Sequence, residues 1–235
     1  MNLIEIKSPA KLNLHLQVLN RRLDGFHNIS SLFTLIDITD GMSFKRTDKY
    51  IDLVESTPIK DNIVQKAAML LKENYGVSKG VTINLSKSIP DQKGLGGGSS
   101  NAASTLLCLN KLWDLDLTQL ELQSLALQLG SDVPFFIYGK TAWAEGRGEL
   151  LSNFQYKERF FILIFPDEKI NTKEAFNSFK IKDDLKLNKE NFHDDLSFNS
   201  FEKWARNKYS NINSLFKKFE SIGKPRLSGT GSTIF

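Results

Sequence analysis

The chain has 235 residues, of which 40% are hydrophobic and 25% are charged, a composition typical of a globular protein with one large domain or two modest ones. Its longest apolar run, Phe160–Phe165, is far shorter than the ~20 residues that a transmembrane helix needs, and no signal peptide is expected because apolar and polar residues alternate at the N-terminus. The net charge of +4 arises between Lys169 and Lys224, where acidic residues are interleaved, so we expect a solvated surface there and no nucleic-acid partner.

The first predicted element is a β-strand over residues 11–18, where apolar and polar residues alternate with a period of two. We expect this strand to be half-buried, with Lys11 and Asn13 on the same, more polar face. After it, the dipeptide Asp24-Gly25 predicts a turn.

Further strands and helices follow from the spacing of apolar residues. Strands are predicted at 33–38, 42–44, 51–54, 81–85, 141–145 and 160–165, the last of them apolar enough to be central. Helices are predicted at 61–75, 101–113 and 119–129, and Thr118 with Glu121 has the form of a capping box at the start of the third. Beyond Asp167 the chain becomes polar and is expected to be mostly helical, with a domain boundary near 151–158.

The single cysteine, Cys108, lies within the second of these helical patterns and cannot form an internal disulfide. We therefore expect a buried thiol in a reducing, cytoplasmic compartment. No cluster of His, Cys and Asp residues has the spacing of a metal site, so no metal-ligating residues are predicted.

The strongest local signal is the glycine-rich segment that runs from Pro90 into the helix predicted at 101–113. Four of the five residues in Gly94–Gly98 are glycine, and Ser99 and Ser100 follow. Glycines let backbone N–H groups wrap a phosphate, and the helix that follows adds unpaired N–H groups and the positive end of its dipole. The alternative is a flexible surface loop, which rarely runs directly into an amphipathic helix of small residues.

Two common phosphate-binding motifs do not fit this segment. A Walker A loop needs Gly-Lys-Ser/Thr, but Gly98 is followed by Ser99. The dinucleotide-binding fingerprint needs a glycine three residues after Gly96, where Ser99 stands. The segment therefore indicates a phosphate loop of a third kind.

Three segments together resemble the signatures of the GHMP kinases, the superfamily of galactokinase and of the homoserine, mevalonate and phosphomevalonate kinases. In chain order they are Ser8–Leu14, Gly94–Ala103 and Leu227–Ser232. The segments Arg22–His27 and Leu129–Phe136 are most similar to the branch that acts on 4-diphosphocytidyl-2-C-methyl-D-erythritol in the non-mevalonate route to isoprenoid precursors. The resemblance runs in order from Ser8 to the last residue.

The resemblance implies a two-lobed α+β fold with the active site in the cleft between the lobes. It divides the chain into an ATP-binding domain at 1–152 and a second domain at 153–235. Members of the superfamily normally continue with more strand and helix, so we expect the second domain to be truncated at Phe235, which puts activity in doubt more than function class.

The resemblance also implies functional residues and a reaction. The reaction would transfer phosphate from ATP, with Mg²⁺, to the 2-hydroxyl of a cytidine diphosphate ester of methylerythritol. The catalytic residues would be Lys11 and Asp132. Nucleotide-binding residues would be Pro90, Gly94, Leu95, Gly96, Gly97, Gly98, Ser99 and Ser100, with Asn62 and Lys87 near the adenine. Substrate-binding residues would be Asn13, Phe26, His27, Thr172 and Phe176.

The chemistry gives each of these roles a physical reason, and an ordinary structural role remains open for several of the residues. Asp132 would accept the proton of the attacking hydroxyl, and Lys11 would neutralise developing phosphate charge. Alternatively, Asp132 caps a turn and Lys11 is an exposed residue at a strand start. Phe176 would stack on cytosine and His27 would bond its edge, although a histidine beside a turn is more often merely solvated.

Two other functions remain possible from the sequence. The first is a related kinase for homoserine or phosphomevalonate, which would have the same fold. The second is a catalytically inactive relative that binds nucleotide or RNA.

Residues Asp91, Gln92 and Lys93 replace the glycines that are common before the loop in this superfamily. The start of the loop is therefore expected to be stiffer and more cationic.

Overall fold

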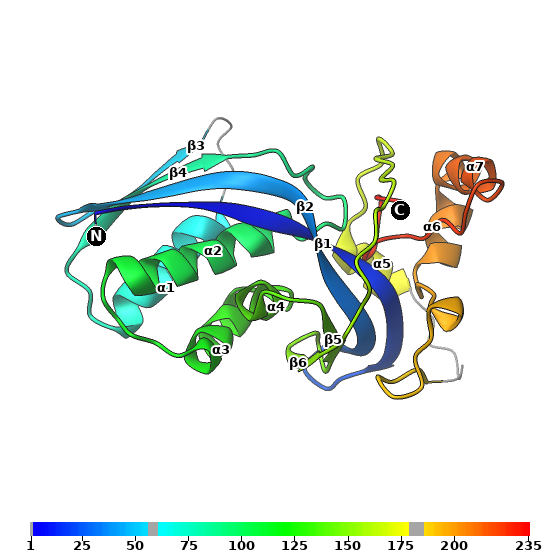
Figure 1. Ribbon diagram of the computed structural model, residues 1–235, viewed down its shortest axis with the longest axis horizontal. Helices are drawn as coiled ribbons and strands as arrows, with labels where there is room; N and C mark the ends of the chain where they lie inside the picture. The colour runs from blue at the N-terminus through cyan, green and yellow to red at the C-terminus, as the bar shows by residue number, and fades with distance from the viewer. Residues whose placement is uncertain (1, 56–60, 179–185) are drawn as a thin grey trace. The chain divides into compact units, whose positions relative to one another are not determined.

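The computed structural model describes residues 2–55, 61–178 and 186–235 (Figure 1). The chain forms two compact units, each built from several segments. The first unit comprises Met1–Ala10, Leu35–Pro90 and Gly96–Lys140, and the second comprises Lys11–Thr34, Asp91–Leu95 and Thr141–Phe235. Strands β1 (Leu3–Arg21) and β2 (His27–Thr47), which pair with each other, contribute residues to both units.

The first unit consists of a sheet with helices on one face, as Figure 1 shows. Strand β4 (Gly80–Ser86) pairs parallel with β3 (Ile51–Glu55) and antiparallel with residues 41–47 of β2. The helices are α1 (Ile63–Asn74), α2 (Gly97–Leu112), α3 (Gln119–Leu129) and α4 (Val133–Tyr138). Buried side chains such as Leu71, Ile83 and Leu106 form the core between these layers.

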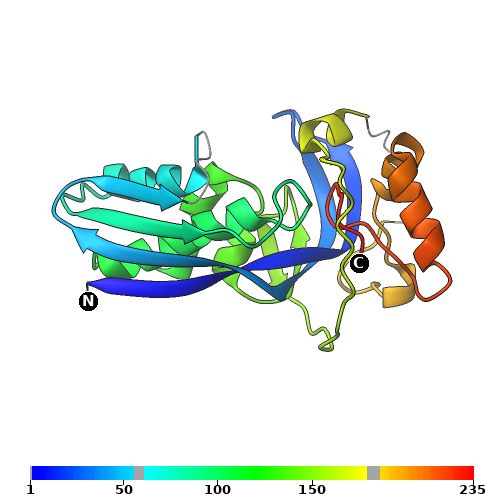
Figure 2. The same ribbon diagram turned by 90° about the horizontal axis from the view of Figure 1, so that it is seen from above.

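The second unit has a smaller sheet and several short helices. Strand β5 (Ala142–Glu145) pairs antiparallel with residues 31–33 of β2 and with β6 (Leu150–Asn153). The helices are α5 (Thr172–Ser178), a 3₁₀ turn at Asp194–Leu196, α6 (Glu202–Lys208) and α7 (Ser210–Phe219), which Figure 2 shows from a second direction. Trp143, Phe201 and Phe216 are fully buried in this unit.

The α+β class is confirmed, as are most of the predicted elements. Helices α1, α2 and α3 lie where apolar spacing predicts them, and the capping box of Thr118 and Glu121 forms with both of its hydrogen bonds. The strands predicted separately at 33–38 and 42–44 are parts of the single strand β2. The domain boundary at 152/153 stays a prediction, because the compact units follow spatial contacts and are discontinuous in sequence.

Three sequence predictions are wrong. The part beyond Asp167 is not mostly helical, because most of its described residues lie outside the short helices α5, α6 and α7 and the 3₁₀ turn. Residues 160–165 form no strand, and within them only Ile164 makes an isolated bridge, to Ile234. The strand that includes residues 11–18 is buried on both faces, since Lys11, Asn13, His15 and Gln17 are at most 4% exposed. The polar face is covered by distant segments of the same unit, as when Gln17 accepts a hydrogen bond from the backbone of Leu187.

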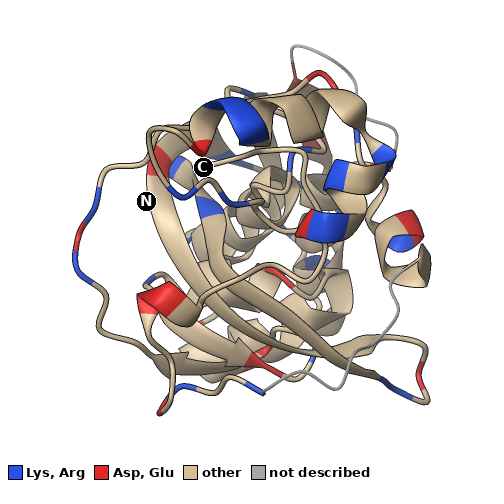
Figure 3. Ribbon diagram, turned by 90° about the vertical axis from the view of Figure 1, so that its right-hand side faces the viewer, with Lys and Arg blue, Asp and Glu red and all other residues tan. Residues whose placement is uncertain are grey.

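The basic stretch at the C-terminal end is interleaved with acidic partners, as Figure 3 shows on the helices that face the viewer. Arg206 pairs with Glu220 at 2.8 Å, Lys224 pairs with Asp195 at 3.1 Å, and Lys208 pairs with Glu174. These pairs agree with a solvated surface of mixed charge. In the ranges that the structure describes, no helix has the length and apolar character needed to cross a lipid bilayer.

Candidate active site

The downstream half of the glycine-rich loop forms the start of helix α2 in the first unit. Gly96 is the N-cap residue with a left-handed φ of 71°, and no side chain caps the helix. The first N–H groups of an α-helix have no acceptor within it, so those of Gly97 and Gly98 are suited to bind an anion. A Cβ added at Gly98 would meet no atom closer than 3.8 Å, so this stretch of backbone is open to a ligand.

One side chain of this half also lacks a partner. The hydroxyl oxygen of Ser100 is buried and makes no hydrogen bond, and the residue is only 1% exposed. A buried polar group without a partner costs free energy, and such groups in native proteins usually serve a ligand or an ion. The first turn of α2 is therefore suited to bind the phosphates of a nucleoside triphosphate, with the Ser100 hydroxyl as one hydrogen-bond donor.

Lys87 belongs to a buried polar network beside the same turn. Its ammonium donates to Asp40 Oδ2 at 2.6 Å and to Asn101 Oδ1 at 3.2 Å, and Asn101 Nδ2 donates to Asp40 Oδ2 at 2.9 Å. A Cβ added at Gly97 would lie 3.2 Å from the Lys87 ammonium, so the cation lies against the loop backbone. The network thus connects β2, the end of β4 and α2.

Sequence analysis did not identify Asp40. It lies in the gap between the strands predicted at 33–38 and 42–44, where β2 is in fact continuous. Burial alone would raise the pKa of Asp40, but hydrogen bonds from Lys87 and from the N–H groups of Ile89 and Ser88 hold it below its ordinary value. No signal in the local sequence reveals these contacts.

The upstream half of the loop packs against the third signature within the second unit. Gly94 has a φ of 75°, and a Cβ there would lie 2.2 Å from the carbonyl oxygen of Ser228. Ser228 Oγ in turn donates to the carbonyl oxygen of Gly94 at 3.0 Å. The third signature therefore contacts the glycine-rich loop at Gly94. Lys93 is held by the carbonyl oxygens of Pro166 and Glu168, which agrees with a stiffened start of the loop.

Lys11 and Asn13 lie together in the second unit, as their spacing predicts. The Lys11 ammonium donates to Asn13 Oδ1, and Asn13 Nδ2 donates to Ser31 Oγ at 3.2 Å. The backbone N–H of Lys11 donates to the carbonyl oxygen of Leu95 at 2.9 Å, so the strand is joined directly to the glycine-rich loop. Both side chains are 3% exposed, which excludes the alternative of an exposed lysine at a strand start.

Asp132 lies immediately before helix α4 in the first unit. Its side chain makes no capping hydrogen bond to that helix, and its assignment to catalysis or to a turn stays a prediction. Pro134 lies in the first turn of α4, where its missing N–H is tolerated, and Val133 is helical rather than extended. The proximity of Asp132 to Lys11 stays a prediction.

Two of the predicted substrate residues, His27 and Phe176, belong to an aromatic group in the second unit. The rings of His27 and Phe176 are 5.1 Å apart, and Phe176 packs edge-on against Phe201 at 4.7 Å. Burial and then the charge of Arg21 lower the pKa of His27, which favours a neutral ring. Thr172, one turn before Phe176 on α5, lies 3.2 Å from the hydroxyl of Thr230 in the third signature.

Phe26 has a partner that sequence analysis missed. The guanidinium of Arg147 lies 3.6 Å from the centre of the Phe26 ring, a cation–π contact, and the ring is 46% exposed. Arg147 is in the Gly146–Gly148 turn between β5 and β6, and the carbonyl oxygen of Gly146 accepts from the N–H of Ile29 at 2.7 Å. An arginine between two glycines is a common turn sequence, so its spacing carries no functional signal.

Asn62 has a local structural role. It caps helix α1 by accepting from the N–H of Val64 at 2.9 Å, and its amide donates to Glu55 at 2.6 Å. These bonds explain the asparagine without a ligand, and its place near adenine stays a prediction.

Two further side chains, His15 and Cys108, are explained by their packing within the protein. Burial, followed by the charge of Arg226, lowers the pKa of His15 to about 4, and its ring stacks on Trp143. Burial raises the pKa of the Cys108 thiol to about 12, which confirms a buried and unreactive thiol.

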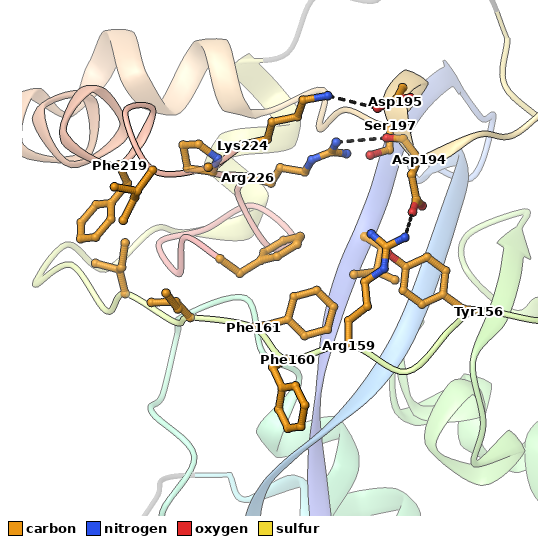
Figure 4. A pocket seen from close by; sticks show the side chains of 17 residues that line it. Tyr156, Arg159, Phe160, Phe161, Asp194, Asp195, Ser197, Phe219, Lys224 and Arg226 are labelled. Carbon is orange, nitrogen blue, oxygen red and sulfur yellow. Dashed lines mark hydrogen bonds and ion pairs between the residues drawn. The ribbon is translucent and has the colours of Figure 1, made fainter.

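A pocket of about 370 Å³ in the second unit contains none of the predicted site residues (Figure 4). Aromatic side chains such as Phe160 and Phe161 line it, and its cations are neutralised locally. Arg159 pairs with Asp194, and Lys224 pairs with Asp195. Among the described residues, no group of three or more His, Cys, Asp and Glu side chains is arranged to hold a metal ion.

Comparisons with known proteins identify the family of the chain. The family described as the GHMP kinases N terminal domain matches residues 62–140. A 4-diphosphocytidyl-2-C-methyl-D-erythritol kinase of Paraburkholderia xenovorans is 40% identical over 243 residues, which cover 97% of this chain and 83% of that protein. The kinase of the same name from Acinetobacter baylyi is also 40% identical, with coverage of 99% and 86%.

Solved structures agree with this result. A crystal structure of 4-(cytidine 5′-diphospho)-2C-methyl-D-erythritol kinase superposes with a TM-score of 0.80 at 31% identity, covering 98% of this chain and 88% of that one. The homoserine kinase of Cytophaga hutchinsonii, at 17% identity and a TM-score of 0.64, shares the fold. With relatives this similar over nearly its whole length, the chain belongs to the 4-diphosphocytidyl-2-C-methyl-D-erythritol kinase family of the GHMP kinases.

Proposed function

We propose that this chain transfers the terminal phosphate of ATP to the 2-hydroxyl of 4-diphosphocytidyl-2-C-methyl-D-erythritol, a step in the synthesis of isoprenoid precursors. The observation that carries the proposal is the 40% identity to kinases of that name over 97% of the chain. The geometry adds physical support at the nucleotide end and at the cytidine end.

At the nucleotide end, the phosphates would bind at the first turn of α2. The open backbone at Gly98 and the buried Ser100 hydroxyl without a partner support this placement. Mg²⁺ would supply charge neutralisation between the phosphates, and it usually takes most of its ligands from phosphate oxygens and water. The Ser100 hydroxyl is the described group best suited to assist in holding it.

At the reacting oxygen, we assign Lys11 and Asp132 as the catalytic residues. Phosphoryl transfer needs positioning and charge compensation, and Asp132 would accept the proton of the attacking hydroxyl. The Lys11 ammonium is oriented by its bond to Asn13, so little reorganisation is needed when phosphate charge develops. Asn13 would therefore orient the cation as well as meet the substrate.

At the cytidine end, the aromatic group would hold the base. Phe26 offers a partly exposed ring, and His27 and Phe176 lie side by side in the same unit. A base stacks favourably on such rings, and a neutral imidazole can both donate and accept at a base edge. This chemistry favours a nucleotide ester over a small alcohol such as homoserine.

The test is an assay of ADP release by the purified chain with three alcohols: the diphosphocytidyl ester, homoserine and phosphomevalonate. We expect turnover with the first and little with the others. Turnover of homoserine or phosphomevalonate instead would replace the substrate assignment. ATP binding without turnover of any alcohol would indicate an inactive relative, and steeply salt-dependent RNA binding would indicate the RNA-binding alternative.

A further inference from the structure

A buried carboxylate lies close to the predicted phosphate site and has no assigned role. Asp40 is 0% exposed and accepts four hydrogen bonds. Its Oδ1 accepts from the backbone N–H groups of Ser88 at 2.7 Å and Ile89 at 2.8 Å. Its Oδ2 accepts from Lys87 and Asn101. Four well-aligned donors satisfy the carboxylate and keep it ionised despite burial.

Three of the groups in this network belong to segments that form the predicted nucleotide site. Lys87 and Ile89 lie in the segment that leads to the loop, and the Lys87 ammonium lies against Gly97. Asn101 is in the first turns of α2 and follows Ser100, whose hydroxyl lacks a partner. Asp40 therefore holds the loop-side lysine and the start of α2 in one fixed arrangement.

We infer that Asp40 is a positioning residue for the nucleotide, which fixes the Lys87 ammonium and the Asn101 amide beside the first turn of α2 before ATP binds. This inference rests on the proposed function only in its use of ATP. Asp40 is buried beneath these groups and acts through them.

The physical reason for a carboxylate here is preorganisation. The Lys87 side chain is only 18% exposed, and a partly buried ammonium without a counter-charge would be costly and would turn toward solvent. Asp40 compensates the charge, so the cation can stay at the loop in the absence of ligand. Groups that are already oriented need no rearrangement when ATP arrives, and the affinity for ATP is higher as a result.

The test is the variant Asp40→Asn. Its amide nitrogen would face either the Lys87 ammonium and the Asn101 amide or, when flipped, the N–H groups of Ser88 and Ile89, so a donor would oppose a donor in both orientations. We expect the affinity for the non-hydrolysable analogue adenylyl imidodiphosphate, measured by calorimetry, to fall at least about tenfold, as for the loss of a partner in a buried charge pair. The KM for the alcohol should change less than about twofold, because none of the proposed substrate-binding residues belongs to the network.

A matched control is Asp114→Asn, which removes an exposed carboxylate in the same unit. Asp114 pairs with Arg46 at 3.6 Å and with Lys79 at 3.4 Å beyond the other end of α2, and nucleotide affinity should be unchanged. If Asp40→Asn does not fold, Lys87→Met tests the same inference, since it removes the positioned cation and leaves the other donors to Asp40.

The outcomes separate the inference from the proposed function. A folded Asp40→Asn or Lys87→Met protein that binds the analogue as tightly as the wild type overturns the inference. Equal rises in the KM values for ATP and for the alcohol also overturn it, because they indicate general disruption. A wild-type protein that binds the analogue but phosphorylates another alcohol refutes the proposed substrate and leaves the role of Asp40 intact.

Discussion

The two halves of the glycine-rich loop use glycine for different reasons. At Gly94 the space for a side chain is taken by the protein, since a Cβ would lie 2.2 Å from the carbonyl oxygen of Ser228. At Gly98 a side chain would be tolerated by the protein, because an added Cβ would make only an ordinary van der Waals contact, with the Ile63 side chain 3.8 Å away. The first glycine is therefore required by the fold, whereas the second leaves room for a ligand. The sequence alone does not distinguish these two roles, because both positions belong to the same run of glycines.

The largest effect that tests this division is expected outside the loop. Asp132→Asn removes the proposed proton acceptor and leaves both halves of the loop unchanged. We expect kcat to fall about 100-fold or more, with ATP affinity little changed. Steady-state kinetics with a nucleotide-binding measurement checks this. An unchanged kcat would show that Asp132 is not the proton acceptor. A large loss of ATP affinity would show that Asp132 also contributes to nucleotide binding.

The second effect is a loss of stability at Gly94. Gly94→Ala adds a methyl group where backbone atoms already lie, at a left-handed φ of 75°. We expect the free energy of unfolding to fall by about 3 kcal/mol or more, measured by urea denaturation. Gly76→Ala is the control, because Gly76 also has a positive φ, of 60°, but has no atom within 4 Å of the added Cβ. Its cost should be about 1 kcal/mol. Equal costs for the two variants would contradict the packing argument.

The third effect is a loss of nucleotide affinity at Gly98. Gly98→Ala places a methyl group within helix α2 at ordinary van der Waals distance from Ile63, so stability should be equal or higher by up to about 1 kcal/mol. The methyl group would obstruct the approach of phosphate, and we expect the KM for ATP to rise about tenfold. Gly223→Ala, where an added Cβ would meet no atom within 4 Å, should change neither quantity. An unaltered KM for ATP would place the phosphates away from this turn.

The smallest effect is expected at Ser100. Ser100→Ala removes a buried hydroxyl that has no partner in the protein, so stability should rise by about 1 kcal/mol. The same change removes a donor to phosphate or magnesium, and ATP affinity should fall a few-fold. Thermal denaturation with and without adenylyl imidodiphosphate measures both changes at once. A stabilised protein with full ATP affinity would show that the hydroxyl has no role in binding.

The helices and strands differ in how well they could be predicted from the sequence. Periodicity located α1, α2 and α3 well, because an amphipathic helix is a local pattern with a local cap. The prediction at Phe160–Phe165 failed for the opposite reason: apolar residues favour a strand, but a strand needs a neighbour to pair with. Only Ile164 pairs, and Phe160 is fully exposed.

The candidate site divides in the same way. Lys11 and Asn13 could be paired from the sequence, since a two-residue spacing places them on one face of a strand. Asp40 could not be found, because its side-chain partners Lys87 and Asn101 are 47 and 61 positions away. The contact between Arg147 and Phe26 could likewise not be predicted, because a cation–π contact depends on where two separate turns meet.

The sequence by itself determined the family, the chemistry of the glycine-rich loop and the positions of α1, α2 and α3. These properties depend on backbone freedom and on side-chain period, which neighbouring residues set. Tertiary structure decided which glycines serve the fold and which leave room for phosphate, which face of β1 is covered, and which carboxylate holds Lys87. Those outcomes depend on contacts between distant segments, whose free energy exists only once the chain has folded.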